Sequence, residues 1–432
     1  MRVTDLVQQL LGTDLPVRVE AYDGSVAGPP SAATTVVVRS PDALRRILGA
    51  PGELGFARAY IAGDLDVEGS IFDVLALRDR FPNPRVGPRE AAAIVRLLGT
   101  DLRPPAPPDI EFVARGRRHS QSRDRASVSH HYDVSNDFYE TVLGSTMTYS
   151  CAVFEHEDQP LDRAQQNKNE LICRKLGLRP GMRLLDVGCG WGGMVIHAAR
   201  HHGVHAVGAT VSAAQAHLAR RRVAAEGLES LVEIRLQDYR DVVDGPFDAI
   251  SSIGMFEHVG RARVRTYLDH LTSLLGEGGR LLNHAISRPQ HQRSRLPRRS
   301  FVNRYVFPDG ELHEVGTVIT AMAGSGLEVR HAESLREHYA LTLRHWVANL
   351  EAGWDAAVAS AGPPRARAWR LYMAGSALNF EANRTGIHQV LATAPDPAGR
   401  STMALRPTWE RDPLHRVLDL RPSTHPPAVR VP

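Results

Sequence analysis

The sequence predicts an α/β fold with a mostly parallel, seven-stranded sheet, preceded by a small N-terminal domain. From about residue 126 onward, apolar segments of five to eight residues alternate with helical segments, a pattern typical of a parallel sheet covered on both faces. One predicted strand ends in Asp186 and continues through a glycine-rich turn into a helix. The length of 432 residues allows two or three domains.

Residues 1–85 are predicted to form the small mixed domain. Its expected elements are a helix at Val3–Leu11, a strand at Thr34–Arg39, a helix at Pro41–Leu48, a helix, glycine stop and strand within Leu54–Val67, and a helix at Phe72–Phe81. Residues 86–125 are rich in proline and arginine and are expected to be a linker with one helix, Glu90–Leu98.

Residues 126–395 are predicted to form the larger domain. Its seven expected strands are Arg183–Gly188, His205–Thr210, Val232–Gln237, Phe247–Ile253, Gly279–Ile286, Leu327–Ala332 and Ile387–Thr393. The segment 288–312 fits no sheet element and lies where such folds carry a lid. Residues 396–432 are expected to be a C-terminal extension.

The composition excludes several classes of protein. Apolar residues make up 43% and charged residues 23% of the chain, as in ordinary globular proteins. No apolar run approaches the ~18 residues of a membrane span, and the N-terminus lacks the pattern of a signal peptide, so a cytoplasmic location is expected. Three widely spaced cysteines argue against a disulfide framework or a cysteine-rich metal site. A net charge of +4 is too small to imply nucleic-acid binding.

The glycine-rich turn is the strongest local signal for a cofactor. In LLDVGCGWGG (184–193), an acid precedes the first glycine, and this spacing is typical of S-adenosylmethionine (SAM) methyltransferases and not of the dinucleotide fingerprint. The alternative is a tight strand–helix turn that binds nothing. The candidate cofactor residues in the loop and after the next two strands are Asp186, Gly188, Gly190, Gly192, Thr210, Gln215, Asp238 and Tyr239.

Several segments together resemble one family. They are HHYDVSNDFY (130–139), TYSCA (148–152), the glycine loop, SIGMFEHVG (252–260), NHAI (283–286) and HY (338–339). Over residues 120–393 the chain is similar to the cyclopropane-fatty-acyl-phospholipid synthase family, which includes the mycolic acid cyclopropane synthases. The resemblance implies a Rossmann-like SAM methyltransferase fold.

The resemblance also implies roles for particular residues. It assigns SAM contacts to Tyr149, Ser150, Gly188, Gly190, Thr210, Gln215 and Tyr239. It assigns a bound bicarbonate or carbonate ion to a cage made by Cys151, Glu257, His284, Ile286 and Tyr339. Taken singly, these residues have plainer interpretations: a buried cysteine, a helix cap and a core histidine. Glu140 is either a solvated helix residue or an added base.

The resemblance implies methyl transfer from SAM to the cis double bond of an unsaturated phospholipid acyl chain. The resulting carbocation would lose a proton to give a cyclopropane or a 10-methylene chain, and a partner reductase could saturate the latter. Two alternatives are an N- or O-methyltransferase for a soluble small molecule and an inactive lipid-binding protein. The arginine-rich segments 287–307 and Arg115–Arg125 suggest peripheral contact with the inner membrane surface. The alternative for segment 287–307 is an ordinary solvated loop. Homo-oligomerisation is left open.

Overall fold

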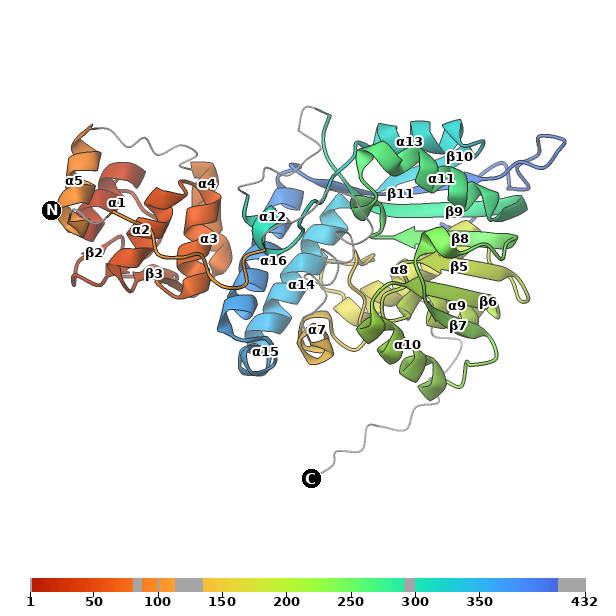
Figure 1. Cartoon of the computed structure of the whole chain (residues 1–432), viewed down its shortest axis with the longest axis horizontal. Coiled ribbons are helices and arrows are strands. Elements are labelled where there is room, and N and C mark those ends of the chain that lie inside the picture. Colours follow the sequence, from red (N-terminus) through yellow and green to blue (C-terminus); the bar gives the residue numbers. More distant parts are fainter. Residues whose placement is uncertain (1, 81–87, 100–101, 113–134, 291–299, 411–432) are drawn as a thin grey trace, which may run out of the picture. The chain divides into compact units, whose positions relative to one another are not determined.

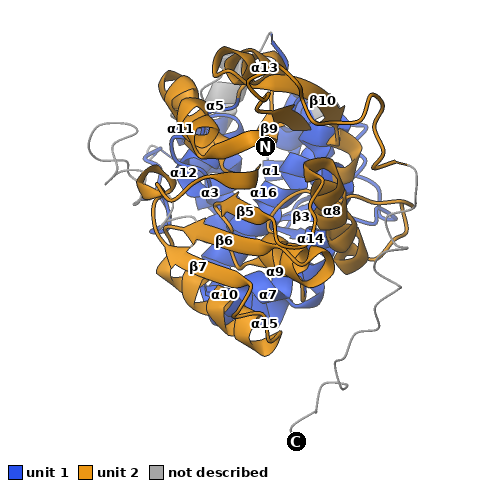
Figure 2. Cartoon of the chain, turned by 90° about the vertical axis from the view of Figure 1, so that its right-hand side faces the viewer, with its two compact units in different colours: residues 1–144, 289–312, 339–385 blue, residues 145–288, 313–338, 386–432 orange. Residues whose placement is uncertain are grey.

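The computed structural model describes residues 2–80, 88–99, 102–112, 135–290 and 300–410. The chain forms two compact units, and each is built from separate stretches of sequence (Figure 2). Unit 1 contains residues 1–144, 289–312 and 339–385, whereas unit 2 contains residues 145–288, 313–338 and 386–432. The predicted boundaries at 85, 125 and 395 assumed continuous domains and therefore do not coincide with these units.

Unit 2 contains the predicted seven-stranded sheet (Figure 1). Its strand order is β10-β11-β9-β8-β5-β6-β7, and β11 pairs antiparallel with both of its neighbours. The other neighbouring pairs are parallel. The strands are β5 (Arg183–Val187), β6 (His205–Thr210), β7 (Val232–Leu236), β8 (Phe247–Ile253), β9 (Leu275–Ser287), β10 (Glu328–Ser334) and β11 (Gly386–Thr393). The prediction of a mostly parallel sheet is confirmed.

Side chains alternate between the two faces of this sheet because successive residues of a strand point in opposite directions. Leu281 and Ala285 of β9 pack in the apolar core together with Val390 of β11 and with residues of α11 (Val264–Ser273) and α13 (Val315–Gly324). His284 and Gln389 occupy intervening positions and point to the other face. There α8 (Leu161–Leu176) packs near β9 and against α9 (Gly193–His202). The remaining long helix of the unit is α10 (Ala213–Ala225).

Unit 1 begins with a four-stranded sheet of order β2-β1-β3-β4. Its elements through residue 98 are α1 (Val3–Leu11), β1 (Arg18–Ala21), β2 (Val26–Ala27), β3 (Thr35–Val38), α2 (Pro41–Gly49), α3 (Glu53–Ala62), β4 (Leu65–Glu68), α4 (Ile71–Arg80) and α5 (Pro88–Leu98). The helices and strands predicted here are present, but the short strands β1 and β2 were not predicted. The later helices of the unit are α7 (Asn136–Leu143), α12 (Phe301–Tyr305), α14 (Arg336–Ala352, in this unit from Tyr339), α15 (Trp354–Ala361) and α16 (Pro363–Glu381).

The segment predicted to be a lid is connected to the N-terminal part of unit 1. Glu111 accepts two hydrogen bonds from the Arg58 guanidinium, at 2.7 and 2.8 Å, and one from the Tyr305 hydroxyl at 2.7 Å. The amide of Phe112 donates to the Arg304 carbonyl at 2.7 Å. A carboxylate this deeply buried is stable only when it is paired, so Glu111 fixes α12 to α3. Residues 291–299 of the predicted lid lie outside the described residues, as does the arginine segment 115–125.

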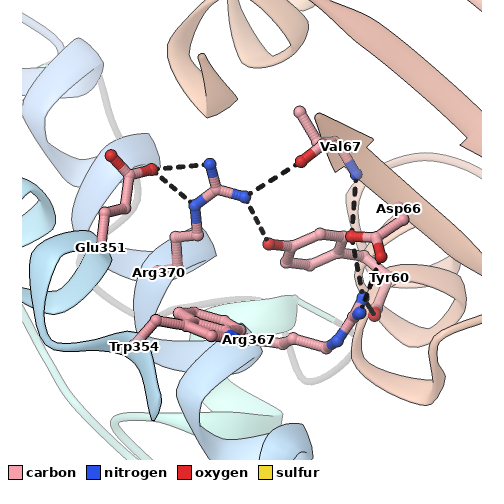
Figure 3. Close-up of a pocket in the computed structure, with 7 residues that line it drawn as sticks. All are labelled: Tyr60, Asp66, Val67, Glu351, Trp354, Arg367 and Arg370. Carbon is pink, nitrogen blue, oxygen red and sulfur yellow. Dashed lines mark hydrogen bonds and ion pairs between the residues drawn. The ribbon is translucent and has the colours of Figure 1, made fainter. Parts of the chain in front are cut away.

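Two arginines of α16 join this helix to the N-terminal sheet around a polar cavity of about 310 Å³ (Figure 3). Arg367 pairs with Asp66 at 2.9 Å. Arg370 donates to Glu351 at 2.7 Å, to the Tyr60 hydroxyl at 3.0 Å and to the Gly69 carbonyl at 3.0 Å. The two cations face two carboxylates, so the cavity wall is close to neutral and its charges already have partners. We therefore interpret this cavity as a structural junction.

No helix in the described part of the chain combines the length and the apolar character that crossing a bilayer requires.

We expect Arg370→Met to lower the free energy of unfolding by about 2–3 kcal/mol, because it leaves the buried Tyr60 hydroxyl and the carbonyls of Val67 and Gly69 without their charged donor. Urea unfolding followed by tryptophan fluorescence measures the change. Arg18→Met is the matched control, since Arg18 pairs with Glu20 within one partly exposed strand and should contribute less than about 1 kcal/mol. Equal losses in the two variants would contradict the structural role of Arg370.

Candidate active site

The glycine loop follows β5 and is shaped by three glycines with positive φ. Gly188, Gly190 and Gly192 have φ values of 76°, 54° and 82°, a region that other residues enter at a cost. The amides of Gly188 and Cys189 both donate to the Ala209 carbonyl, at 2.9 and 3.0 Å, which fastens the loop to the end of β6. A Cβ atom at Gly190 would meet no protein atom within 4 Å. The loop therefore borders open space at Gly190, as a close-fitting ligand requires.

Asp186 lies beneath this loop and is almost completely buried. Its carboxylate accepts a hydrogen bond of 2.6 Å from the Ser251 hydroxyl. Burial raises the pKa of Asp186 to about 6, although Ser251 and the nearby Lys168 oppose this shift. The Lys168 ammonium is also buried, and desolvation lowers its pKa to about 8. Asp186 thus supports the loop from inside the protein, and its carboxylate is already engaged with Ser251.

The ends of β6 and β7 carry the other predicted cofactor residues. The Thr210 hydroxyl donates to the Gln215 side chain at 2.8 Å, so these two residues form one polar group at the end of β6. Asp238 is buried and accepts a 2.8 Å hydrogen bond from Nε of Arg240. Tyr239 is half-buried, and its ring packs edge-on against Tyr267 at 4.9 Å. These positions fit a nucleoside, with hydroxyl or amide groups for a ribose and an aromatic ring for a base.

The segment around Tyr149, Ser150 and Cys151 is held by buried side chains of the same unit. Gln165 of α8 donates to the Ser150 carbonyl at 2.8 Å. The Cys151 thiol is fully buried and lies 3.7 Å from the Leu335 carbonyl. The amide of Phe154 donates to Nδ1 of His338 at 3.1 Å. These contacts hold the backbone of residues 150–154 in place. The role of Cys151 in an anion cage stays a prediction.

Glu257 follows β8 in the short helix η2 (Phe256–His258), with its side chain directed at β9. Its Oε1 accepts a 2.7 Å hydrogen bond from the Ile286 amide. Oε2 is buried and has no hydrogen-bond partner among the described residues. Burial raises the pKa of Glu257 to about 7, in spite of the Ile286 hydrogen bond. This carboxyl group can therefore gain or lose a proton near neutral pH.

His284 lies near the end of β9, and its imidazole is 1% exposed. Nδ1 is 3.0 Å from Nε2 of Gln389 on the neighbouring strand. Nε2 is buried without a hydrogen-bond partner among the residues described. Burial first, and then the nearby charges of Lys168 and Lys175, lower the pKa of His284 well below its ordinary value, so the ring is neutral. The side chain that contacts the ring is thus Gln389, which the sequence analysis did not single out.

The predicted residues Tyr339 and Glu140 belong to unit 1. Tyr339 is buried in α14, where its ring packs 4.7 Å from Phe380. It directly follows His338, which is bound to the Phe154 amide. Glu140 is exposed on α7, and its role stays a prediction.

One group of metal-ligating residue types lies between α8 and α9. The Cys173 thiol and ring nitrogens of His197 and His202 fall within 4.8 Å of one another. Both imidazoles are already hydrogen-bonded to Oε2 of Glu170, at 3.3 and 3.0 Å. Because this carboxylate satisfies both rings, the cluster is explained as a buried hydrogen-bond network.

Comparisons with known proteins agree with this geometry. Residues 119–390 match the model of the mycolic acid cyclopropane synthetase family. A probable fatty acid methyltransferase of Mycobacterium tuberculosis is 48% identical over 407 residues, covering 91% of this chain and 95% of the relative. The cyclopropane-fatty-acyl-phospholipid synthase of Escherichia coli is 33% identical, covering 84% of this chain and 88% of that protein.

A solved structure supports the fold assignment. The mycolic acid cyclopropane synthase CmaA1, crystallised with SAH and CTAB, superposes with a TM-score of 0.59 at 35% identity, covering 62% of this chain and 98% of that one. The family match spans more than half of the sequence and includes the glycine loop, Glu257 and His284. The chain therefore belongs to the mycolic acid cyclopropane synthetase family and is an S-adenosylmethionine-dependent methyltransferase.

Proposed function

We propose that this enzyme transfers a methyl group from SAM to the cis double bond of an unsaturated phospholipid acyl chain. The observation that carries the proposal is the pair Glu257 and His284. Each presents one buried polar atom that has no partner in the described structure, at the carboxyl ends of adjacent parallel strands. The glycine loop follows β5, which is the next strand beyond β8. Ligands of open α/β sheets bind along this edge.

The chemistry requires little from the protein before methyl transfer. When bound, SAM supplies an electrophilic methyl group, and an alkene needs no base to attack it. After the transfer a positive charge develops on the second alkene carbon and a proton must leave. The residues at the carboxyl ends of β8 and β9 must therefore stabilise a cation, exclude water and take up a proton.

Glu257 and His284 are suited to hold a small anion such as bicarbonate between them. With its proton on Nε2, the neutral His284 ring donates one hydrogen bond. Glu257, with its pKa of about 7, donates from Oε2 when protonated and accepts a proton when ionised. Bicarbonate would supply a base beside the carbocation. We include the backbone at Cys151 and Ile286, and the Tyr339 hydroxyl, in the same proposed cage on the strength of the resemblance.

The product of the reaction and the location of the enzyme in the cell are also proposals. The product is either a cyclopropane or a 10-methylene chain that a separate reductase would saturate, and both types of modification are consistent with the named relatives. We place the enzyme at the cytoplasmic surface of the membrane, on the basis of the arginine-rich composition of segment 287–307. Of its described arginines, Arg288 pairs with Glu314 and Arg304 lies 3.8 Å from Glu111, so the proposal does not rest on these two. The alternative substrate, a soluble small molecule methylated at N or O, would require neither the anion nor the membrane.

Incubating the full chain with SAM and vesicles of an oleoyl phospholipid tests the function directly. We expect the acyl chain to gain one CH₂ unit by mass spectrometry, because either product adds a methyl carbon and loses one proton. Proton NMR then distinguishes vinylidene from cyclopropane signals. If the vesicles stay unmodified while small amines or alcohols accept the methyl group, the acyl-chain proposal is wrong.

Gly190→Val should abolish SAM binding in calorimetry while the fold persists, because the branched side chain would fill the open space at the loop. Gly227→Val is a matched control. Gly227 also has a positive φ, 64°, and no atom near its Cβ position, but it follows α10 outside the predicted cofactor residues. The control carries a similar backbone strain of about 1–2 kcal/mol and should bind SAM normally. If both variants bound SAM with the same affinity, the glycine loop would not be part of the cofactor site.

Glu257→Gln should lower turnover about a hundredfold and leave SAM affinity unchanged. Glutamine can still accept the hydrogen bond from the Ile286 amide, but it cannot exchange a proton. Glu233→Gln on the exposed part of β7 is the control and should turn over normally. Full activity of Glu257→Gln would exclude a proton-handling role for this carboxyl group.

The same variant has a stability signature that is independent of activity. Because the pKa of Glu257 rises from 4.5 to about 7 on folding, its stability contribution is complete below about pH 4.5 and is lost as the pH rises to about 7. The loss amounts to about 3 kcal/mol. Glu257→Gln does not ionise, so it should gain stability relative to the wild type between about pH 5 and about pH 8. A constant difference across this range would contradict the raised pKa.

A further inference from the structure

Three polar residues lie at one level across three neighbouring strands of the seven-stranded sheet. Gln389 of β11 is directly opposite His284 of β9 on one side and Glu333 of β10 on the other. Residues paired in this way project from the same face of a sheet, with Cβ atoms about 5 Å apart. The helix α8 lies against this face and contributes Lys175. The register of the strands thus brings Glu333, Lys175, Gln389 and His284 together as a polar row, which ends at the proposed anion site.

Hydrogen bonds connect this row from one end to the other. The Lys175 ammonium is fully buried and pairs with Oε2 of Glu333. It also donates to Oε1 of Gln389 at 2.7 Å. Nε2 of Gln389 is then 3.0 Å from Nδ1 of His284. Glu333 is about one-third exposed, so the row runs from the protein surface to the buried ring.

The donor and acceptor of each hydrogen bond in this row follow from the Lys175 ammonium, which can only donate. A lysine ammonium has three donors and no acceptor, so the side-chain oxygen of Gln389 must face Lys175. The amide NH₂ of Gln389 therefore faces His284, and Nδ1 of the ring must accept. A neutral imidazole that accepts at Nδ1 carries its proton on Nε2.

We propose that Lys175 and Gln389 are positioning residues that hold His284 as a neutral ring with its proton on Nε2. This inference concerns the active site and rests on the proposed function. A proton on Nδ1 would face the N–H of Gln389, and two donors that face each other repel. His284 therefore serves as a hydrogen-bond donor to the anion, through Nε2, throughout the reaction. It follows that the proton released by the carbocation is not taken up by His284, which leaves that role to Glu257 or to the bound anion.

The composition gives independent support. Lys168 and Lys175 are the two lysines of a chain with 52 lysine and arginine residues. Both are buried, and both lower the pKa of His284. A lysine ammonium is a compact point charge with three donors on a flexible stem, whereas an arginine guanidinium is a planar fork with five donors, so the two side chains are not interchangeable at a position that faces Glu333 and Gln389. The two lysines of this arginine-rich chain thus both act electrostatically on His284.

Gln389→Glu tests the inference because it keeps the shape of the side chain and replaces its donor with an acceptor. We expect the His284 proton to move to Nδ1, turnover to fall on the order of a hundredfold, and the KM for SAM to stay unchanged. Nitrogen-15 NMR of the full chain with labelled histidine, assigned with His284→Ala, reports which ring nitrogen carries the proton. His388→Gln is the control, since His388 is adjacent on β11, points to the opposite face and bonds Ser287; its turnover should match the wild type.

The two measurements separate this inference from the function on which it rests. If the wild-type ring carries its proton on Nδ1, the inference is wrong whatever the activities are, and this holds even if Gln389→Glu fails to fold. If the proton is on Nε2 and moves in Gln389→Glu, but His284→Ala retains full turnover, the positioning is correct and the anion cage is wrong. If His284→Ala is inactive while Gln389→Glu keeps both turnover and the Nε2 proton, the positioning role is excluded.

Discussion

The burial of ionisable groups along one edge of the seven-stranded sheet is the constraint on which unit 2 depends. A charge moved into the protein interior costs several kcal/mol unless it is paired or neutralised. Asp186 and Lys175 are paired, with Ser251 and Glu333 respectively. Glu257 and His284 have pKa values shifted toward their neutral forms. Of these four groups, only Glu257 and His284 keep a buried polar atom, Oε2 and Nε2 respectively, that has no hydrogen-bond partner among the described residues.

Much of the sheet could be predicted from the sequence because its strands are short apolar runs between clear helix signals. The predicted bounds of β6 and β8 agree with the structure. The four residues of β3 (TVVV) form a β-branched run and were predicted. The strand β1 (RVEA) is equally short but carries two charged residues, and β2 has only two residues, so neither shows such a run. The two-unit organisation was also not predicted. It depends on contacts such as those of Arg367 and Arg370, which connect α16 to residues about 300 positions earlier, and local sequence patterns do not indicate contacts over such a separation.

The residues of the candidate site differ in how far the sequence alone could indicate them. Glu257 and His284 were singled out by motifs that resemble the family, and the glycine loop by its spacing, and their roles stay predictions. Gln389 could not be found in this way, because its relation to His284 arises only from the antiparallel register of β11 and β9, across 105 positions of sequence. For Lys175 the sequence did hold a signal, the rarity of lysine, but its meaning required knowing where the side chain lies.

The position of β11 has a consequence for how the chain is made. This strand lies between β9 and β10 in the sheet, yet the ribosome synthesises it after both, and after the three helices α14, α15 and α16. Until it is inserted, β9 and β10 present unpaired strand edges, which are prone to associate with other chains. His284 emerges about a hundred residues before the glutamine that contacts it. A nascent chain thus contains its glycine loop, Glu257 and His284 well before β11 is synthesised, and the hydrogen-bonded row that includes His284 is completed only when this last strand enters the sheet.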